Sequence, residues 1–453
     1  MSSLTPSTPS SLRLLRQFIF VDLLLLFLIT VTLTTNEAMA FGLSSIPQPT
    51  GLSPELITSL ARKRYKVNNV DNNDNNNIDD DGPPMHGNVA VITGAAGGIG
   101  RELSRVVYNL GGTVVAIDRN VAGLDSLVQD LACNNSDRNS SSNSNEEAET
   151  PPRIICIPTQ HEDLESVARS AEEIKSRFDS IDLLVNNAGL TYPLDKCKPG
   201  MERMKAKNGY DLAFIVNYLS HFLLVEKLLP HLQASPSGGR IVHITSTYHY
   251  KVDGSELIPR TLSTSDGKAM PMAYQSDPAL MSSKHVERAY ANTKLAQIWH
   301  SRSMSIRGGV PSVCACPTWA GTGIAGEEKR EFMERFAFPV AGAGIASALN
   351  AMFRSDEELG DALSTTENGG QSIVANSRTV EYLPLKNVWM SDWVTKLGWR
   401  DGIVDFAGLI LLYGQWFTFG EFLIQRSSPE SYNNKSGRDA LYEWSLKEVE
   451  PWL

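Results

Sequence analysis

The chain is poor in cysteine and has no excess of basic charge. Its 453 residues include only five cysteines, none of which forms a Cys-x-x-Cys pair. Five cysteines cannot all pair within one chain, so we expect a reducing compartment in which most of them are small core residues. Acidic residues outnumber basic ones by 51 to 41, and the net charge is −10. The sequence therefore lacks the basic field that nucleic-acid binding requires.

The N-terminal 40 residues have the pattern of a secretory signal peptide. Arg13 and Arg16 precede an apolar run from Phe18 to Leu33, and the small-x-small tripeptide Ala38-Met39-Ala40 follows it. The alternative is a signal anchor that stays in the membrane. Asp22 and the shortness of the apolar core argue against a stable span.

Residues 41–84 predict a transit peptide-like segment followed by a disordered linker. Phe41 comes directly after the expected cleavage site, and the stretch to Lys66 has Ser, Pro and a single acidic residue, Glu55. This layout resembles the two-part plastid-targeting sequences of algae with secondary plastids, such as diatoms. We therefore expect a plastid location, with the endoplasmic reticulum as the alternative.

The run of Asn and Asp from 72 to 81 cannot bury a core and predicts a linker. The basic cluster of the segment is Arg62, Lys63, Arg64 and Lys66.

Short apolar strands alternate with amphipathic helices from residue 85 onward. This alternation predicts a parallel sheet covered on both faces. We expect a doubly wound α/β fold of the Rossmann type, in a single catalytic domain over 85–453. A stretch rich in Ser, Asn and Glu at 134–152 predicts a surface insertion. The expected strands are 89–93, 113–117, 153–157, 181–185, 240–245 and 313–316, and the expected helices are 99–110, 121–132, 164–178, 211–232 and 283–307.

A glycine-rich turn, Thr93-Gly94-Ala95-Ala96-Gly97-Gly98-Ile99-Gly100, joins the first expected strand to the first helix. Glycines are needed where a turn is tight and where the backbone must approach a pyrophosphate, and the helix N-terminus offers free N–H groups to phosphates. A glycine turn alone is weak evidence, but a position between strand and helix supports dinucleotide binding. We expect Gly94, Gly98, Ile99 and Gly100 to contact the cofactor.

The second expected strand ends in Ile117-Asp118-Arg119, which bears on cofactor choice. A carboxylate at Asp118 can accept both hydroxyls of the adenine ribose and would repel a 2′-phosphate. Arg119 could instead pair with that phosphate. The glycine turn carries no basic residue, so the sequence favours NAD, with NADP as the alternative.

Three ordered motifs resemble those of the short-chain dehydrogenase/reductase family. They are the glycine turn, Asn186-Asn187-Ala188-Gly189 and Tyr290-Ala291-Asn292-Thr293-Lys294. The chain looks closest to the retinol-dehydrogenase-like members of that family, a group with plastid relatives. The further stretches that carry this resemblance are 216–224, 240–246, 316–322 and 440–445.

The resemblance implies a role for each motif residue. Tyr290 would be the acid/base that exchanges a proton with the substrate oxygen. A free tyrosine has a pKa near 10, and Lys294, one helical turn on, would lower it through its positive charge. Ser246 would hydrogen-bond the substrate oxygen, and Asn217 would hold a water behind the lysine for a proton relay. Tyr290 and Lys294 would also contact the cofactor, together with Asn187, Ala188, Gly189 and Thr322.

Two further segments depart from the family pattern. Residues 251–283 lengthen the gap between Ser246 and Tyr290 and predict a lid or pocket wall, with a decorative loop as the alternative. Residues 385–432 hold four tryptophans and an apolar run from 406 to 420 that is short for a bilayer span. A membrane-surface helix within 402–425 would help a lipophilic substrate to enter. A helix packed on the domain or a homodimer interface is the alternative.

The leading interpretation is an enzyme that interconverts an alcohol and a carbonyl with a nicotinamide cofactor. The family resemblance alone implies a lipophilic substrate, such as a retinoid, carotenoid, sterol or long-chain aldehyde. A protochlorophyllide reductase-like enzyme is one alternative. A nicotinamide-sensing binding protein of the plastid envelope is another, but such a sensor would not need Ser246, Tyr290 and Lys294 together.

Overall fold

The computed structural model describes a Rossmann-type domain together with one helix that precedes it in sequence. The expected signal peptide lies outside the described residues. The residues that the structure describes are 51–65, 82–139, 153–191, 204–261, 268–275, 283–317, 320, 322, 340, 342–363, 372–375, 423–428 and 434–453.

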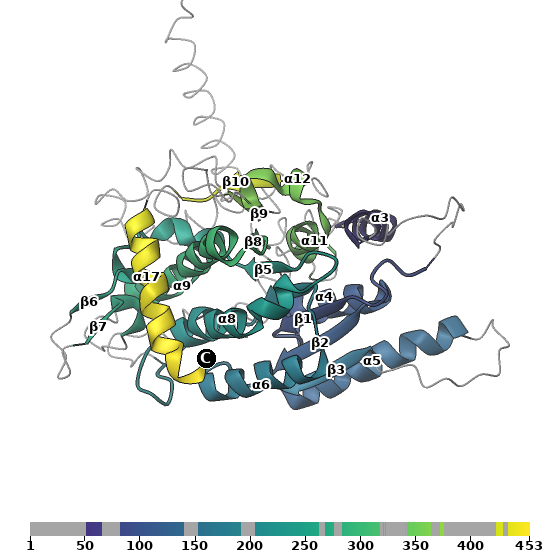
Figure 1. The fold of residues 1–453 in the computed structure, drawn as a ribbon, viewed down its shortest axis with the longest axis horizontal. Coiled ribbons are helices and arrows are strands. Elements are labelled where there is room, and N and C mark those ends of the chain that lie inside the picture. Colours follow the sequence, from purple (N-terminus) through teal and green to yellow (C-terminus); the bar gives the residue numbers. More distant parts are fainter. Residues whose placement is uncertain are drawn as a thin grey trace, which may run out of the picture. The chain divides into compact units, whose positions relative to one another are not determined.

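An eight-stranded sheet forms the centre of the fold (Figure 1). Its strand order is β10-β9-β8-β5-β4-β1-β2-β3, and every neighbouring pair is parallel except β9 and the edge strand β10. The order reverses between β1 and β4, which is the switch point where α/β sheets of this type bind ligands. The strands are β1 (Val89–Thr93), β2 (Thr113–Asp118), β3 (Ile154–Pro158), β4 (Leu183–Asn186), β5 (Arg240–Ile244), β8 (Ser312–Cys316), β9 (Ser372–Ala375) and β10 (Leu423–Arg426).

Helices cover both faces of the sheet because successive strand residues point to opposite sides. Ala90 and Ile92 of β1 belong to one core cluster, whereas Val89 and Val91 belong to the other. The first cluster is covered by α4 (Gly98–Asn109), α5 (Val121–Asn139) and α11 (Ala346–Phe353). The second is covered by α6 (Leu164–Arg177), α8 (Ser220–Gln233), α9 (Ser283–Ser303) and α17 (Lys435–Val449).

The expected strands and helices are confirmed, with some changes of boundary. Helix α5 continues to Asn139, so the expected insertion at 134–152 begins inside a helix. The expected helix at 211–232 consists of α7 (Leu212–Phe214), a π-helical turn η2 (Ile215–Leu219) and α8. The run from Leu212 to Gln233 is apolar enough to cross a membrane, but 78% of its most apolar window is buried inside the protein, as in a core helix.

The described part of 251–283 packs against the domain. Its elements are η3 (Thr247–Lys251), η4 (Ser255–Leu257), the hairpin β6 (Arg260–Thr261) and β7 (Ala269–Met270), and η5 (Met272–Tyr274). The Tyr274 ring stacks on Tyr210, with 4.2 Å between ring centroids, and its hydroxyl donates to Glu448 of α17. Glu256 accepts hydrogen bonds from Arg288 and Asn292 of α9. These contacts support α9, the helix that carries Tyr290.

Most of 385–432, including the apolar run at 406–420, lies outside the described residues. Its end does not. Residues 423–426 form β10, which pairs with β9 in the central sheet. The main-chain N–H of buried Ser428 donates to His249 Nε2 over 3.2 Å. This part of the expected insertion is therefore an integral part of the fold.

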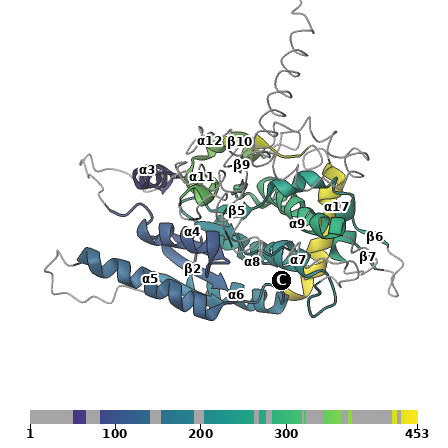
Figure 2. The same ribbon diagram turned by 180° about the vertical axis from the view of Figure 1, so that it is seen from behind.

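Helix α3 (Pro54–Tyr65) lies within the segment expected to be a transit peptide and linker. It packs beside α11, where Tyr65 meets Phe353 edge-on with ring centroids 6.4 Å apart (Figure 2). Leu52, Leu60 and Ala61 also belong to the core cluster on this face. The described core therefore includes residues from Leu52 onward, which precede the domain boundary expected at residue 85.

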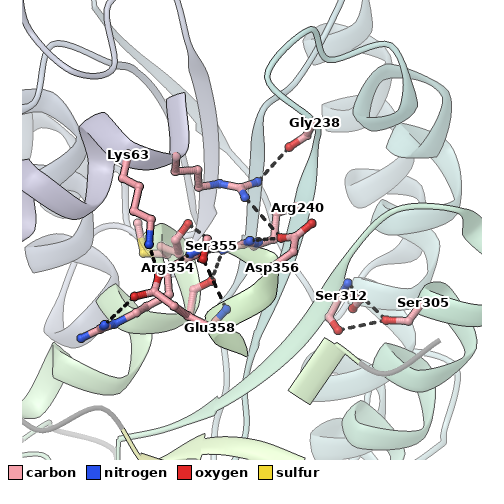
Figure 3. A network of polar contacts seen from close by, with 12 residues as sticks. Lys63, Gly238, Arg240, Ser305, Ser312, Arg354, Ser355, Asp356 and Glu358 are labelled. Carbon is pink, nitrogen blue, oxygen red and sulfur yellow. Dashed lines mark hydrogen bonds and ion pairs between the residues drawn. The ribbon is translucent and has the colours of Figure 1, made fainter. Parts of the chain in front are cut away.

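The basic residues of α3 join a polar network at the loop after α11 (Figure 3). Arg64 donates to the Gly238 carbonyl over 2.8 Å and lies 3.7 Å from the Asp356 carboxylate, while Lys63 lies 3.4 Å from Glu358. Buried Arg240 pairs with the same Asp356 and donates to the main-chain carbonyls of Ala351, Met352 and Arg354. The cluster that suggested targeting thus also holds α3 on the domain.

Candidate active site

The glycine turn folds as the spacing predicts. Gly94 and Gly98 have φ values of 68° and 52°, a conformation that favours glycine. A Cβ at Gly94 would come within 2.8 Å of Asn187 Nδ2, so the turn packs closely on the end of β4. Helix α4 begins at Gly98 with no side-chain cap and no acidic residue in its first turn. Its free N–H groups therefore suit the phosphates of a dinucleotide.

Thr322 lies beside this turn. A Cβ on Gly98 would meet the Thr322 methyl carbon at 3.4 Å. Thr322 and Gly98, both predicted to contact the cofactor, thus lie next to each other.

Asp118 and Arg119 end strand β2 as expected, but the Asp118 carboxylate already has partners. It accepts hydrogen bonds from the main-chain N–H groups of Ala96, in the glycine turn, and Asn120, over 3.0 and 2.9 Å. Arg119 is exposed and lies 3.9 Å from Glu162. The Asp118 carboxylate therefore supports the glycine turn and places a negative charge beside it. The positive charge of Arg119 is partly offset by Glu162.

The buried hydroxyl of Thr93 connects β1 to the Asn186–Gly189 motif. It accepts the main-chain N–H groups of Asn187 and Ala188, each over 2.9 Å, and it lies 3.0 Å from His221 Nε2. The Asn187 amide donates to the Thr93 carbonyl over 2.9 Å. Asn187 and Ala188 thus join two neighbouring strands at the sheet's switch point.

Asn217 lies in the π-helical turn and is fully buried. Turns of this kind interrupt α-helices most often at functional sites. The Asn217 side chain exchanges two hydrogen bonds with the main chain of Leu190, over 2.8 and 2.9 Å, and donates to Thr293 Oγ1 over 3.1 Å. Gly189 lies directly against it, since a Cβ there would be 3.3 Å from Asn217 Oδ1. Asn217 therefore fixes the loop after β4 to the helix that carries Tyr290.

Ser246, and neither of its threonine neighbours, meets Tyr290. Ser246 follows β5 in extended conformation, and its hydroxyl oxygen accepts the Tyr248 N–H over 3.3 Å. The Ser246 hydroxyl also lies close enough to the Tyr290 phenol to lower its pKa. Thr245 instead donates to the Lys294 main-chain carbonyl over 3.1 Å. The predicted register of the serine is the one that the fold adopts.

His249 holds the loop that carries Ser246. Its Nδ1 donates to the Ser246 carbonyl over 2.7 Å, and its Nε2 accepts the Ser428 N–H. Burial lowers the pKa of His249 to about 4, so the ring is neutral and both contacts persist at physiological pH. The contact with Ser428 could not be foreseen, because 179 residues separate the two positions.

The Tyr290 phenol is held in its neutral form. Burial raises its pKa, the neighbouring Cys316 and Tyr248 raise it further, and only the Ser246 side chain lowers it. The sequence led us to expect that the charge of Lys294 lowers the pKa of Tyr290. In the structure the surroundings of the phenol raise that pKa instead. Tyr248 lies edge-on to Tyr290, with ring centroids 5.5 Å apart, and forms an aromatic wall next to the phenol.

Lys294 lies beneath Tyr290, and its ammonium nitrogen is 5.4 Å from the centroid of the ring. The ammonium donates to the Ile244 carbonyl over 2.9 Å and to Gln297 Oε1 over 3.1 Å. Burial lowers the pKa of Lys294 to about 8, whereas nearby Cys316 and Cys314 raise it. The lysine is therefore close to half charged near pH 8, which weakens its field at the phenol.

The fold thus gathers the predicted residues into two adjoining groups. Gly94, Gly98, Asp118 and Thr322 surround the start of α4, and Asn217, Ser246, Tyr290 and Lys294 surround the ends of β4 and β5. Gln297 was missed by sequence reasoning. The one available signal was its position three residues after Lys294, which places it on the same helix face.

Residues 88–254 match the family profile described as short chain dehydrogenase. A short-chain dehydrogenase/reductase of Armillaria gallica is 30% identical over 175 residues, which are 38% of this chain and 49% of that protein. The polyprenol dehydrogenase of Mus musculus is 34% identical over 172 residues, 37% of this chain and 44% of that protein. The chloroplastic short-chain dehydrogenase TIC 32 A of Brassica napus is 28% identical over 221 residues, 48% of this chain and 57% of that protein.

Over this part, the chain is similar to short-chain dehydrogenases/reductases. It spans about half the length of the curated relatives that it matches. The family profile covers the glycine turn, Asn217 and Ser246 but ends before Tyr290 and Lys294. The match therefore does not bear on those two residues, and their catalytic roles stay predictions.

Proposed function

We propose that this protein is an oxidoreductase that transfers a hydride between a nicotinamide cofactor and the alcohol or carbonyl group of a lipophilic substrate. The observation that carries the proposal is the convergence of three side chains from two elements. The Ser246 side chain acts on the Tyr290 phenol, whose pKa it lowers, and the Lys294 ammonium lies 5.4 Å from the centroid of the Tyr290 ring. A phenol, a hydroxyl and an ammonium so arranged suit proton exchange with a substrate oxygen.

The residues around α4 fit a dinucleotide. The uncapped helix N-terminus and the open space beside Gly97, where a Cβ would meet nothing within 4 Å, leave room for a pyrophosphate. Asp118 would accept the adenine ribose hydroxyls. Its negative charge and the pairing of Arg119 with Glu162 make NAD the proposed cofactor in preference to NADP.

When bound, the nicotinamide supplies the carbon that accepts or returns the hydride, and in its oxidised form a positive ring charge. In carbonyl reduction Tyr290 donates its proton to the substrate oxygen as the hydride reaches the carbonyl carbon, which leaves an alcohol and a phenolate. In alcohol oxidation the phenolate takes that proton back. Ser246 holds the substrate oxygen, and the Lys294 ammonium stabilises the phenolate. Because burial keeps the phenol neutral, the side chains as arranged favour the reductive direction.

A lipophilic alcohol or aldehyde is the proposed substrate class. A relative named polyprenol dehydrogenase supports this choice, as does the aromatic wall that Tyr248 forms beside Tyr290. Retinoids, carotenoids, sterols and long-chain aldehydes fall in the class. Contact with a membrane surface through 402–425 would help such a substrate to enter, and a homodimer is the alternative use of that segment.

A plastid is the proposed location. The chloroplastic relative TIC 32 A and the two-part layout of residues 1–66 support it. A fluorescent protein fused after residue 84 would test this proposal in an alga with secondary plastids. Accumulation in the endoplasmic reticulum instead would contradict it.

The full chain should be titrated with the oxidised and reduced forms of NAD and NADP and then assayed with a panel of lipophilic alcohols and aldehydes. Tyr290→Phe should lower kcat by about 10³-fold or more, because the phenyl ring has no proton to exchange, and it should leave cofactor affinity within about twofold. Turnover that survives this substitution would overturn the mechanism. Cofactor binding with no turnover on any substrate would favour the nicotinamide-sensing alternative.

A further inference from the structure

Gln297 hydrogen-bonds both Lys294 and Asn217, two residues of the proposed proton-transfer site. Its Oε1 accepts a hydrogen bond from the Lys294 ammonium over 3.1 Å, and its Nε2 donates to the Asn217 main-chain carbonyl over 2.8 Å. Gln297 is 1% exposed, so both bonds are shielded from water. The family resemblance implies a water between Asn217 and Lys294, and the glutamine amide also joins these two residues.

The orientation of the amide follows from its partners. A carbonyl oxygen can only accept and an ammonium can only donate, so Nε2 must face Asn217 and Oε1 must face Lys294. The Asn217 carbonyl also accepts a bond from His221 Nδ1 over 3.1 Å. This carbonyl lies in the π-helical turn, where the regular α-helical bonding pattern is interrupted. The turn thus presents an acceptor on which the amide can be anchored.

We propose that Gln297 is a positioning residue. Its amide is anchored on the Asn217 carbonyl, and together with the Ile244 carbonyl it holds the Lys294 ammonium in place. The proposal rests on the function proposed above, because it assigns Gln297 a task in that site. The lysine has three N–H groups, and two of them are held by Ile244 and Gln297. The third is left to act toward Tyr290 and the cofactor.

Gln297 also bears on the charge of the lysine. An acceptor on the ammonium stabilises the protonated form against the burial that disfavours it. The titratable groups that face Lys294 are Tyr290 on α9, Cys314 and Cys316 on β8, His243 on β5 and His221 on α8. Burial holds the pKa values of His221 and His243 well below their usual range, so both rings are neutral. These residues offer Lys294 no carboxylate, and within the described part of the chain the oxygen of Gln297 is one of the two neutral acceptors that it contacts.

The test is a direct titration of Lys294 in protein without added cofactor. The lysine ε-carbons are labelled with ¹³C, the Lys294 resonance is assigned by its loss in Lys294→Met, and its shift is followed from pH 6 to pH 11. Gln297→Met, which has a similar volume but no acceptor, should lower the midpoint by about one pH unit. Gln297→Glu, which places an anion beside the ammonium, should raise it by a similar amount. The two variants therefore predict opposite shifts.

Kinetics supply a second readout. Gln297→Met should lower kcat by about tenfold with substrate KM nearly unchanged, because the effect acts on the charge that develops at Tyr290. Gln233→Met is the matched control: Gln233 donates to the Gly308 carbonyl over 2.8 Å, away from Lys294, and its loss should leave both readouts unmoved.

Unchanged Lys294 midpoints in both Gln297 variants would overturn the proposal. If Gln297→Met does not fold, as judged by circular dichroism, the Glu variant decides alone. An inactive wild-type enzyme would overturn the proposed function but not the NMR result, so the two failures are distinguishable.

Discussion

The ammonium nitrogen of Lys294 lies 5.4 Å from the centre of the Tyr290 ring, yet the hydrogen bonds it makes go to Ile244 and Gln297. In the proposed mechanism the lysine therefore acts on the phenol through its charge and not through a direct bond. Its effect on Tyr290 depends on whether it is protonated, and burial has moved that equilibrium close to physiological pH.

The rate of carbonyl reduction should fall as the pH rises through about 8, the pKa of Lys294. Below this pH the ammonium stabilises the phenolate that remains when Tyr290 has given up its proton. Above it, the neutral amine cannot do so. A profile of kcat from pH 6 to pH 10 measures the effect. Lys294→Arg, which stays charged throughout, should move the fall to higher pH. A wild-type profile that is flat across pH 8 would contradict this account.

Asp118→Asn should weaken discrimination between the two cofactors. The amide keeps one oxygen to accept the Ala96 N–H but removes the charge that would repel a 2′-phosphate. We expect the ratio of kcat/KM for NAD to kcat/KM for NADP to fall by about tenfold, which corresponds to about 1.4 kcal/mol. Steady-state kinetics with both cofactors measure the ratio. An unchanged ratio would mean that Asp118 serves the glycine turn alone.

Thr93→Val should destabilise the fold and weaken cofactor binding together. The substitution keeps the shape but leaves the buried N–H groups of Asn187 and Ala188 without their acceptor. We expect a loss of about 2–4 kcal/mol in the free energy of unfolding, measured with urea. Thr58→Val, on the outer side of α3, removes a hydroxyl that bonds only within its own helix and should cost less than about 0.5 kcal/mol. Equal losses in both variants would count against the role given to Thr93.

Arg64→Met should destabilise the protein more than Lys63→Met does. The Arg64 side chain is only 7% exposed and bonds both Gly238 and Asp356, whereas Lys63 is 58% exposed and makes a single ion pair. We expect losses of about 1–3 kcal/mol for Arg64 and below about 1 kcal/mol for Lys63. Thermal or urea unfolding compares the two. If the Lys63 variant is the less stable, α3 is held by its outer charges and not by the buried network.

The strands and the motif residues could be predicted from sequence because each is encoded locally. β1, β4 and β5 are short apolar runs, and each is followed by polar residues whose spacing is typical of the family. The register of Ser246 follows from the end of β5 in the same way. Parallel strands then bring these ends together, so the site required no knowledge of distant contacts.

Other features depend on contacts between distant segments and were missed for that reason. Helix α3 has the composition of a targeting segment, and its packing on α11 depends on residues nearly 300 positions away. The pairing of β10 with β9 and the bond between Ser428 and His249 are equally remote. The π-helical turn at Asn217 is local, but its sequence is typical of an ordinary helix. The groups that bond Asn217 are the Thr293 hydroxyl of α9 and the Leu190 main chain in the loop after β4.

The docking of α3 has a consequence for the order in which the protein folds. Its partners on α11 and at Asp356 are synthesised last among the elements it contacts, long after α3 itself has left the ribosome. The earliest described helix must therefore wait, with Leu60 and Tyr65 unburied, until most of the chain exists. We expect the segment to be accessible to chaperones and proteases during that interval, and the docking of α3 onto α11 to be one of the last steps toward the native state.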